Sequence, residues 1–216
     1  MKLKFKIQQY QTDAVENVIR VFAGQPNKGL AEYVVDKGKT YMKQNGKLVE
    51  VTKFDFEEDS TGYKNGDISL TKEVLLKNIH QVQTDSNIRL SSDLVDKLGY
   101  CQLDIEMETG TGKTYVYIKS MFELNKLYGW TKFIVVVPSI AIREGVKKSF
   151  DITVDHFMEL YGKKARYFIY NSDNLNQIDT FSQSSDISVM IINTQAFNTS
   201  MKEGSKNSAA RIIYSV

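Results

Sequence analysis

The segment METGTGKT, residues 107–114, constrains this 216-residue chain more than any other feature. It follows an alternating apolar segment and precedes a helical pattern, which is the placement that a phosphate-binding loop requires. Its glycines let backbone N–H groups turn toward an anion, and the following helix adds the positive end of its dipole. We expect Lys113, the catalytic candidate, to reach the β- and γ-phosphates and the Thr114 hydroxyl to ligate Mg²⁺. The expected cofactor-binding residues of the loop are Glu108, Thr109, Gly110, Thr111, Gly112, Lys113 and Thr114.

One position departs from the full pattern G-x-x-x-x-G-K-[ST], because Met107 stands where that pattern has its first glycine. The alternative interpretation is a glycine-rich turn between a strand and a helix that binds nothing. The loop alone also does not separate a kinase, a GTPase and a DNA motor.

Strand-like and helix-like patterns alternate from Tyr100 onward, which predicts an α/β fold with a parallel sheet and helices on both faces. The run FIVVV ends at Pro138 and is typical of a strand buried on both faces. Gly129 predicts the end of the helix that follows the loop, and Ser139 predicts a helix N-cap. The expected strands are 101–107, 133–137, 166–170 and 187–193; the expected helices are 113–128, 139–150 and 156–161, with a polar helical stretch before the last strand.

The first 99 residues divide into two parts. A helix is expected over 11–22, with Thr12 or Asp13 as its cap. Residues 29–99 have the pattern of an inserted α+β segment, in which Asn45-Gly46 predicts the tight turn of a β-hairpin. An acidic, turn-rich loop is expected over 54–67. The predicted domains are 1–28, 29–99 and 100–216.

Composition excludes several classes of protein. The chain is 42% hydrophobic and 25% charged, with a net charge of +2, which is typical of a globular protein rather than a disordered one. Its single cysteine, Cys101, excludes an internal disulfide framework, and its two histidines lack the spacing of metal ligands. It contains no apolar run of membrane-spanning length and no signal-peptide pattern, so we expect a cytoplasmic protein with no membrane partner.

The sequence around the loop resembles a known family. TGTGKT resembles the first motif of superfamily 2 helicases, and residues 103–146 resemble the Res subunit of type III restriction–modification enzymes. FKIQQYQTDAVENV at 5–18 and SVMIINTQAFN at 188–198 resemble the same family. The resemblance implies a P-loop NTPase motor lobe of the RecA type, with ATP and Mg²⁺ as cofactors.

The resemblance also implies roles for individual residues. Gln11 matches a glutamine that reads adenine in many superfamily 2 enzymes; a polar residue on an exposed helix face is the alternative. Ser139 and Arg143 occupy a motif that follows the DNA backbone in these motors, whereas a solvated helix face is the alternative. Thr194 and Gln195 fit a second DNA contact at a strand end.

The Asp-Glu pair of a helicase motif II occurs nowhere in the sequence. We therefore expect an incomplete motor lobe, truncated before motif II, that binds nucleotide but neither hydrolyses it efficiently nor cuts DNA alone. For the parent protein, the resemblance implies an ATP-dependent translocase and endonuclease that acts on double-stranded DNA with a methyltransferase subunit. The alternatives are a non-catalytic ATP- or DNA-binding module, another superfamily 2 helicase and, least favoured, a small-molecule kinase.

Overall fold

A computed structural model describes residues 5–34, 40–44, 47–51, 61–96, 99–171 and 176–196 of the chain. These residues form two compact units, each built from several segments of the sequence. Unit 1 comprises Met1–Gly29, Gly66–Trp130 and Lys148–Lys164; unit 2 comprises Leu30–Asn65, Thr131–Lys147 and Ala165–Val216.

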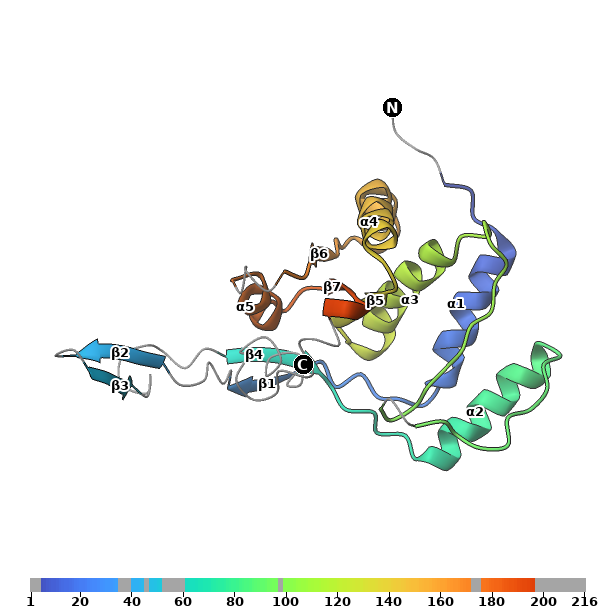
Figure 1. Ribbon diagram of the computed structural model, residues 1–216. Helices are drawn as coiled ribbons and strands as arrows, with labels where there is room; N and C mark the ends of the chain where they lie inside the picture. The colour runs from blue at the N-terminus through green and yellow to red at the C-terminus, as the bar shows by residue number, and fades with distance from the viewer. Residues whose placement is uncertain are drawn as a thin grey trace. The chain divides into compact units, whose positions relative to one another are not determined.

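Unit 1 is helical (Figure 1). It contains α1 (Gln9–Val21), α2 (Lys72–Asp85), α3 (Lys113–Tyr128) and the second part of α4 (Ile140–Tyr161). Side chains join the helices through backbone carbonyls: Tyr128 donates to the carbonyl of Ile19, and Asn78 donates to that of Val21. The buried apolar side chains of this unit include Val15, Leu75, Val116, Ile118, Phe122 and Phe157.

The end of α3 is as predicted. Gly129 caps the helix with a left-handed φ of 76°, and its N–H donates to the carbonyl of Asn125. A Cβ at this glycine would also stand 2.5 Å from the side-chain oxygen of Asn27. Both the backbone angle and the close approach therefore favour glycine here.

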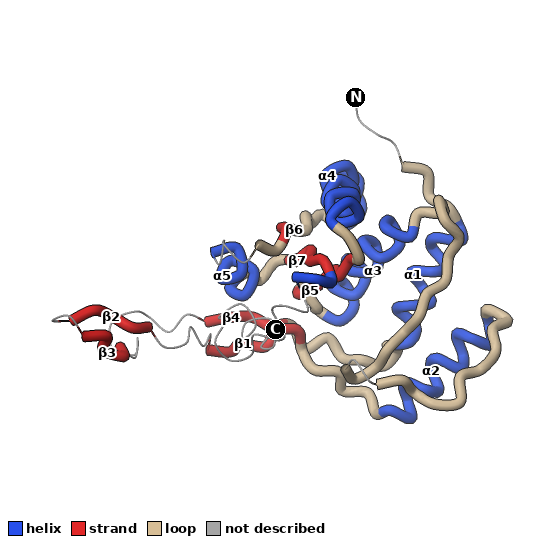
Figure 2. Tube along the Cα trace, in the orientation of Figure 1, coloured by secondary structure: helices blue, strands red, loops and turns tan. Residues whose placement is uncertain are grey.

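Unit 2 is built on a parallel sheet with strand order β5-β7-β6, which confirms the α/β prediction (Figure 2). Its elements are β5 (Lys132–Val137), β6 (Arg166–Ile169), α5 (Asn176–Gln183) and β7 (Ser188–Asn193). The central strand β7 is fully apolar from Val189 to Ile192, and these side chains are fully buried. Ile178 and Phe181 of α5 are also buried and pack with Met190 and Ile192 in one core cluster.

The prediction that 133–137 is buried on both faces is wrong. Ile134 and Val136 of β5 are 36% and 43% exposed, while Val137 is buried. The strand lies at one edge of the described sheet, and the side chains of Ile134 and Val136 stand on a face that is partly open to solvent.

Two antiparallel pairs complete unit 2. The predicted hairpin is present as β2 (Thr40–Gln44) paired with β3 (Lys47–Val51), although its turn, Asn45-Gly46, lies outside the described residues. The predicted loop at 54–67 instead contains β4 (Thr61–Asn65), which pairs with β1 (Leu30–Val34).

Asn65 explains why β4 is held in place. Its side-chain oxygen accepts hydrogen bonds from the N–H groups of Thr131 and Lys132, so it takes the role of a backbone partner at the start of β5.

Three further boundaries differ from prediction. Helix α1 begins at Gln9 with Gln8 as N-cap, upstream of Thr12 and Asp13. Residues 101–107 form no strand, because a strand requires a ladder of backbone partners and the backbone bond found here joins Gln102 N–H to the carbonyl of Val95. The two helices expected over 139–161 are one helix, α4, since no Gly or Pro interrupts the residues between them. The predicted domain boundaries at 28 and 99 stay a prediction.

A buried lysine links β5 to the end of α5. The Nζ atom of Lys132 donates to the carbonyls of Phe181 and Ser184 and lies 5.1 Å from the centre of the Phe181 ring. Burial lowers the pKa of Lys132 from 10.5 to about 8, and the nearby Asp186 opposes this shift. Positive charge near the C-terminus of a helix is favourable because the last carbonyls carry partial negative charge.

Lys132 predicts an unusual pH dependence of stability. Its pKa is lower in the folded state, so the unfolded chain binds more protons between about pH 8 and 10.5 and folding becomes more favourable as pH rises through that window. Relative to a Lys132→Met variant, the wild type is expected to gain about 2 kcal/mol in the free energy of unfolding between pH 7 and pH 9.5. Urea unfolding curves of both proteins measure this difference, and a constant difference across the range would contradict it.

Candidate nucleotide-binding site

The loop at 107–112 and the start of α3 form the candidate site in unit 1. Gly110 and Gly112 have φ angles of 84° and 90°, a left-handed backbone that side chains with a Cβ rarely adopt. Gly112 is the N-cap of α3, and the Thr111 hydroxyl closes the loop by donating to the carbonyl of Glu108 at 2.6 Å. The first N–H groups of a helix have no carbonyl partner within it, so they are available to an anion at this end of α3.

Lys113 is turned onto its own loop. Its ammonium donates to the carbonyls of Met107 and Glu108, at 2.8 Å and 2.9 Å. The ammonium therefore lies over the loop, between two neutral acceptors that an anionic phosphate outcompetes. The contact at Met107 uses only the backbone, so the loop closes on Lys113 without the glycine of the full pattern.

Gln11 contacts this loop from α1. Its side-chain Nε2 donates to the carbonyl of Thr111 at 2.9 Å, a bond that joins residues 100 positions apart. A Cβ at Gly112 would stand 2.5 Å from the same nitrogen. The side chain of Gln11 is therefore packed against the loop and is not simply a polar group on an exposed helix face. Its remaining amide oxygen is an acceptor that the contact with Thr111 leaves unused.

Thr114, the expected Mg²⁺ ligand, is half-buried in the first turn of α3. The nearby phenol of Tyr117 is affected by it: burial raises the pKa of Tyr117, and the Thr114 side chain beside it opposes that shift. Within the described ranges, no three His, Cys, Asp or Glu side chains gather as a metal site would require. The sequence pattern predicts Tyr117 as a core residue of the helix, whereas its position three residues after Thr114 places both side chains on one face of that helix.

The four residues expected to contact DNA belong to unit 2. Ser139 caps α4, because its hydroxyl accepts from the N–H of Ile142 at 3.3 Å, as predicted. Thr194 lies at the end of the adjacent parallel strand, and its hydroxyl donates to the carbonyls of Val137 and Pro138 at 3.4 Å. The carboxyl ends of β5 and β7 thus bring the two hydroxyl groups to the same edge of the sheet. Gln195 follows Thr194 directly, and both have helical backbone at the end of the described residues.

Arg143 lies one turn into α4. Its guanidinium donates to Glu144 at 3.2 Å, and its Nε atom is buried without a hydrogen-bond partner. Its side chain is only 20% exposed, whereas Lys147 and Lys148 on the same helix are exposed. A solvated helix face therefore describes the two lysines but not Arg143. A buried N–H donor without a partner is costly, and an anionic acceptor would remove that cost.

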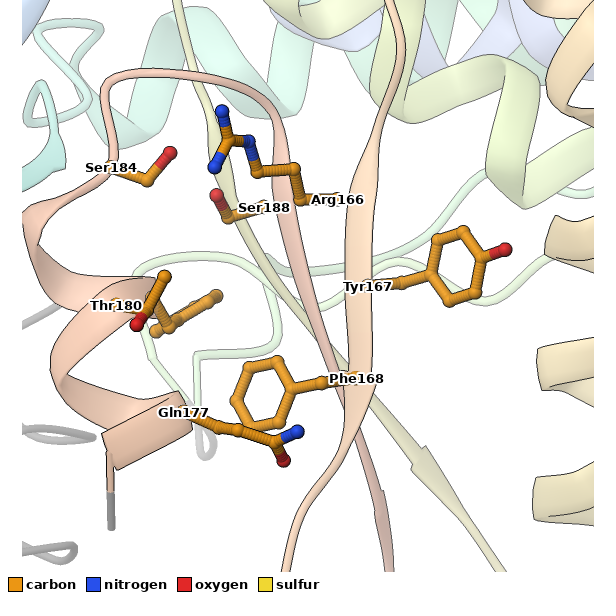
Figure 3. A pocket seen from close by; sticks show the side chains of 8 residues that line it. Arg166, Tyr167, Phe168, Gln177, Thr180, Ser184 and Ser188 are labelled. Carbon is orange, nitrogen blue, oxygen red and sulfur yellow. The ribbon is translucent and has the colours of Figure 1, made fainter. Parts of the chain in front are cut away.

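A separate cavity of about 190 Å³ lies in unit 2 between β6 and α5 (Figure 3). Arg166 and Phe168 point toward α5, whereas Tyr167 points the other way, as expected for alternating residues of a strand. Arg166 is already paired with Asp186 at 3.0 Å, so we assign no phosphate site to this cavity.

The two loop glycines predict different costs of substitution by alanine. Gly110→Ala should cost about 1–2 kcal/mol from the left-handed backbone alone, since nothing lies within 4 Å of its added Cβ. Gly112→Ala should cost about 1 kcal/mol more, because it also displaces Gln11 from Thr111. In a Gln11→Ala background the two substitutions should cost the same. Urea unfolding of the single and double variants measures this, and an extra cost at Gly112 that survives in that background would contradict it.

Comparisons with known proteins identify the family. The family model described as "Type III restriction enzyme, res subunit" matches residues 84–214. The Res subunit of the type III restriction-modification enzyme EcoP15I from Escherichia coli is 36% identical over 110 residues, which make up 50% of this chain and 11% of that protein. The EcoPI Res subunit of Escherichia phage P1 is 34% identical over 121 residues, covering 54% of this chain and 12% of that protein.

The StyLTI Res subunit of Salmonella typhimurium is 39% identical over 115 residues, covering 45% of this chain and 12% of that protein. The matched segments thus span about an eighth or less of these relatives. In the described part of the chain, no helix has the length and apolar character needed to cross a membrane. The family match covers residues 84–214, more than half of the sequence, and the chain therefore belongs to the family of type III restriction enzyme res subunits.

Proposed function

We propose that this chain is the ATP-binding part of the motor of a type III restriction enzyme, and that residues 107–114 bind the phosphates of ATP. The observation that carries the proposal is the position of Lys113, whose ammonium lies over the loop at the N-terminus of α3. Family membership supports it, because that family implies a helicase-like P-loop NTPase fold and the sheet of unit 2 is parallel, as such a fold requires.

Binding of ATP would change the hydrogen-bond partners of Lys113. Lys113 would leave the carbonyls of Met107 and Glu108 for the β- and γ-phosphates, which replaces neutral acceptors with charged ones. The N–H groups at the start of α3 would face the same phosphates. Thr114 would supply its hydroxyl to Mg²⁺, and the ion would neutralise charge that develops on the phosphate oxygens.

Gln11 would set the preference for adenine. Its contact with Thr111 fixes the end of the side chain at the loop, so that the second half of its amide can face a base. An amide offers a donor and an acceptor side by side, which matches the donor and acceptor of the adenine edge. Nε2 carries two N–H groups, so it can keep its bond to the carbonyl of Thr111 and donate a second bond to the base.

DNA contact would come from the carboxyl edge of the sheet in unit 2, through Ser139, Arg143, Thr194 and Gln195. The partly exposed guanidinium of Arg143 and the hydroxyl groups at two adjacent strand ends support this, because phosphate oxygens accept from all of these groups. The relatives are Res subunits of restriction-modification enzymes, so we propose double-stranded DNA and a modification methyltransferase as partners, and a parent enzyme that cleaves DNA.

Nucleotide binding is testable at one lysine. Titration of a fluorescent ATP analogue with Mg²⁺ should show saturable binding that Lys113→Ala weakens more than about tenfold, since it removes charge-assisted bonds to phosphate. Lys126→Ala removes the same charge from the exposed last turn of α3 and should leave affinity unchanged. GTP should compete less well than ATP. Equal affinities for the two lysine variants would exclude the proposed phosphate contact.

DNA binding is testable by its salt dependence. If Arg143 contacts a phosphate, Arg143→Ala should weaken duplex binding at all sequences and lower the slope of log affinity against log salt by about one. Fluorescence anisotropy of a labelled duplex at several salt concentrations gives that slope. Lys126→Ala is again the matched control, and a slope unchanged by Arg143→Ala would remove this residue from the interface.

A further inference from the structure

Three aromatic side chains of unit 1 meet beside the candidate nucleotide site: Phe5, Tyr115 and His156. We propose that these three residues, the aromatic brace, are positioning residues that hold the start of α1 against α3 and so place Gln11 on the phosphate loop. The expected effect of the brace on ATP binding rests on the proposed function. The contacts among the three side chains do not depend on a bound nucleotide.

The brace is closed by a hydrogen bond between Tyr115 and His156 and by contacts of the Phe5 ring with both of their rings. The hydroxyl of Tyr115 and Nε2 of His156 are 2.9 Å apart and hydrogen-bonded. The Phe5 ring lies 4.8 Å from the imidazole of His156 and 6.1 Å from the Tyr115 ring, centre to centre, with the two six-membered rings nearly parallel at 19°. Each of the three side chains therefore contacts both of the others.

The brace packs against the buried core of unit 1. Phe157, which is 1% exposed, packs against the Tyr115 ring with centres 5.4 Å apart. Burial lowers the pKa of His156, with a smaller opposing effect from Glu159 and a smaller lowering effect from Lys119. The imidazole is therefore neutral near pH 7.5 and offers one donor and one acceptor to its neighbours.

The start of α1 gains an external support from this cluster. Its N-cap, Gln8, makes no side-chain capping bond, so no cap side chain satisfies the first N–H groups of the helix. Phe5 lies three residues before that cap, and Gln11 lies three residues after it. Tyr115 is only two residues from Lys113 on α3. A contact between Phe5 and Tyr115 thus fixes the start of α1 relative to the loop that Gln11 must reach.

If the brace served only to fill space, the rings of Tyr115 and His156 would be needed but the hydroxyl and the ring nitrogen would not. The hydroxyl of Tyr115 and the nitrogen of His156 are paired at ordinary hydrogen-bond distance inside an aromatic cluster, which fixes the angle of both rings. Removing the hydroxyl while keeping the ring therefore separates positioning from packing.

The first test uses NMR spectra of the ligand-free chain. Tyr115→Phe and His156→Leu should shift the side-chain amide signals of Gln11 and the backbone amide signals of Gly110 and Gly112. His156→Gln keeps a donor and an acceptor and should restore them. The chain has one other histidine, His80, which bonds to the carbonyl of Ser91, so His80→Gln is the matched control and should leave the loop signals in place.

The second test measures affinity for the ATP analogue and for GTP. Loss of one positioning hydrogen bond should weaken ATP binding about three- to tenfold in Tyr115→Phe and weaken GTP binding less, because the effect passes through Gln11. In a Gln11→Ala background, Tyr115→Phe should have no further effect. Thermal unfolding confirms that each variant is folded at the temperature used.

The two tests separate the brace from the proposed function. If loop and Gln11 signals in Tyr115→Phe and His156→Leu match those of the wild type, the brace is only packing and the inference is overturned. If these signals move but the wild type and Lys113→Ala show no difference in ATP binding, the brace stands and the nucleotide proposal fails. Equal losses of affinity for ATP and GTP in Tyr115→Phe would show that the brace does not act through Gln11.

Discussion

The left-handed backbone of Gly112 is the constraint on which the site depends. It ends the loop and begins α3, so it fixes the direction in which Lys113 leaves the helix. It also leaves the space that Gln11 occupies, because a Cβ there would collide with the glutamine nitrogen at 2.5 Å. The backbone angle of Gly112 therefore affects both Lys113, which is expected to contact the phosphates, and Gln11 of α1. A substitution at Gly112 disturbs both residues at once.

The sequence predicted correctly those elements that are determined by residues within or next to the element itself. The end of α3 follows from Gly129, the cap of α4 from Ser139, and the alternation of β5, β6, α5 and β7 from apolar runs separated by polar segments. The loop itself was predictable for the same reason, since its glycines, lysine and threonine act within eight consecutive residues. Such features need no knowledge of what lies across the fold.

The errors concern features that depend on a distant partner. The alternation of 101–107 is typical of a strand, but a strand exists only where a neighbour supplies a ladder of hydrogen bonds. β4 was missed for the converse reason: its polar sequence reads as a loop, and it is held by pairing with β1 and by the amide of Asn65. The contact of Gln11 with Thr111 joins a helix to a loop, and that of Tyr115 with His156 joins two helices. Both connect segments that are far apart in sequence, so residue spacing gave no signal for either.

The departure at Met107 shows why a motif should be read by the atoms it uses. The first glycine of the full pattern is absent, and a comparison of letters alone would weaken the assignment. In the structure the contact at this position is a backbone carbonyl that accepts from Lys113, and any residue supplies that atom. Gly110 and Gly112, in contrast, have backbone angles that only glycine adopts without strain. The tolerant and intolerant positions of the loop are thus distinguished by its backbone angles and hydrogen bonds.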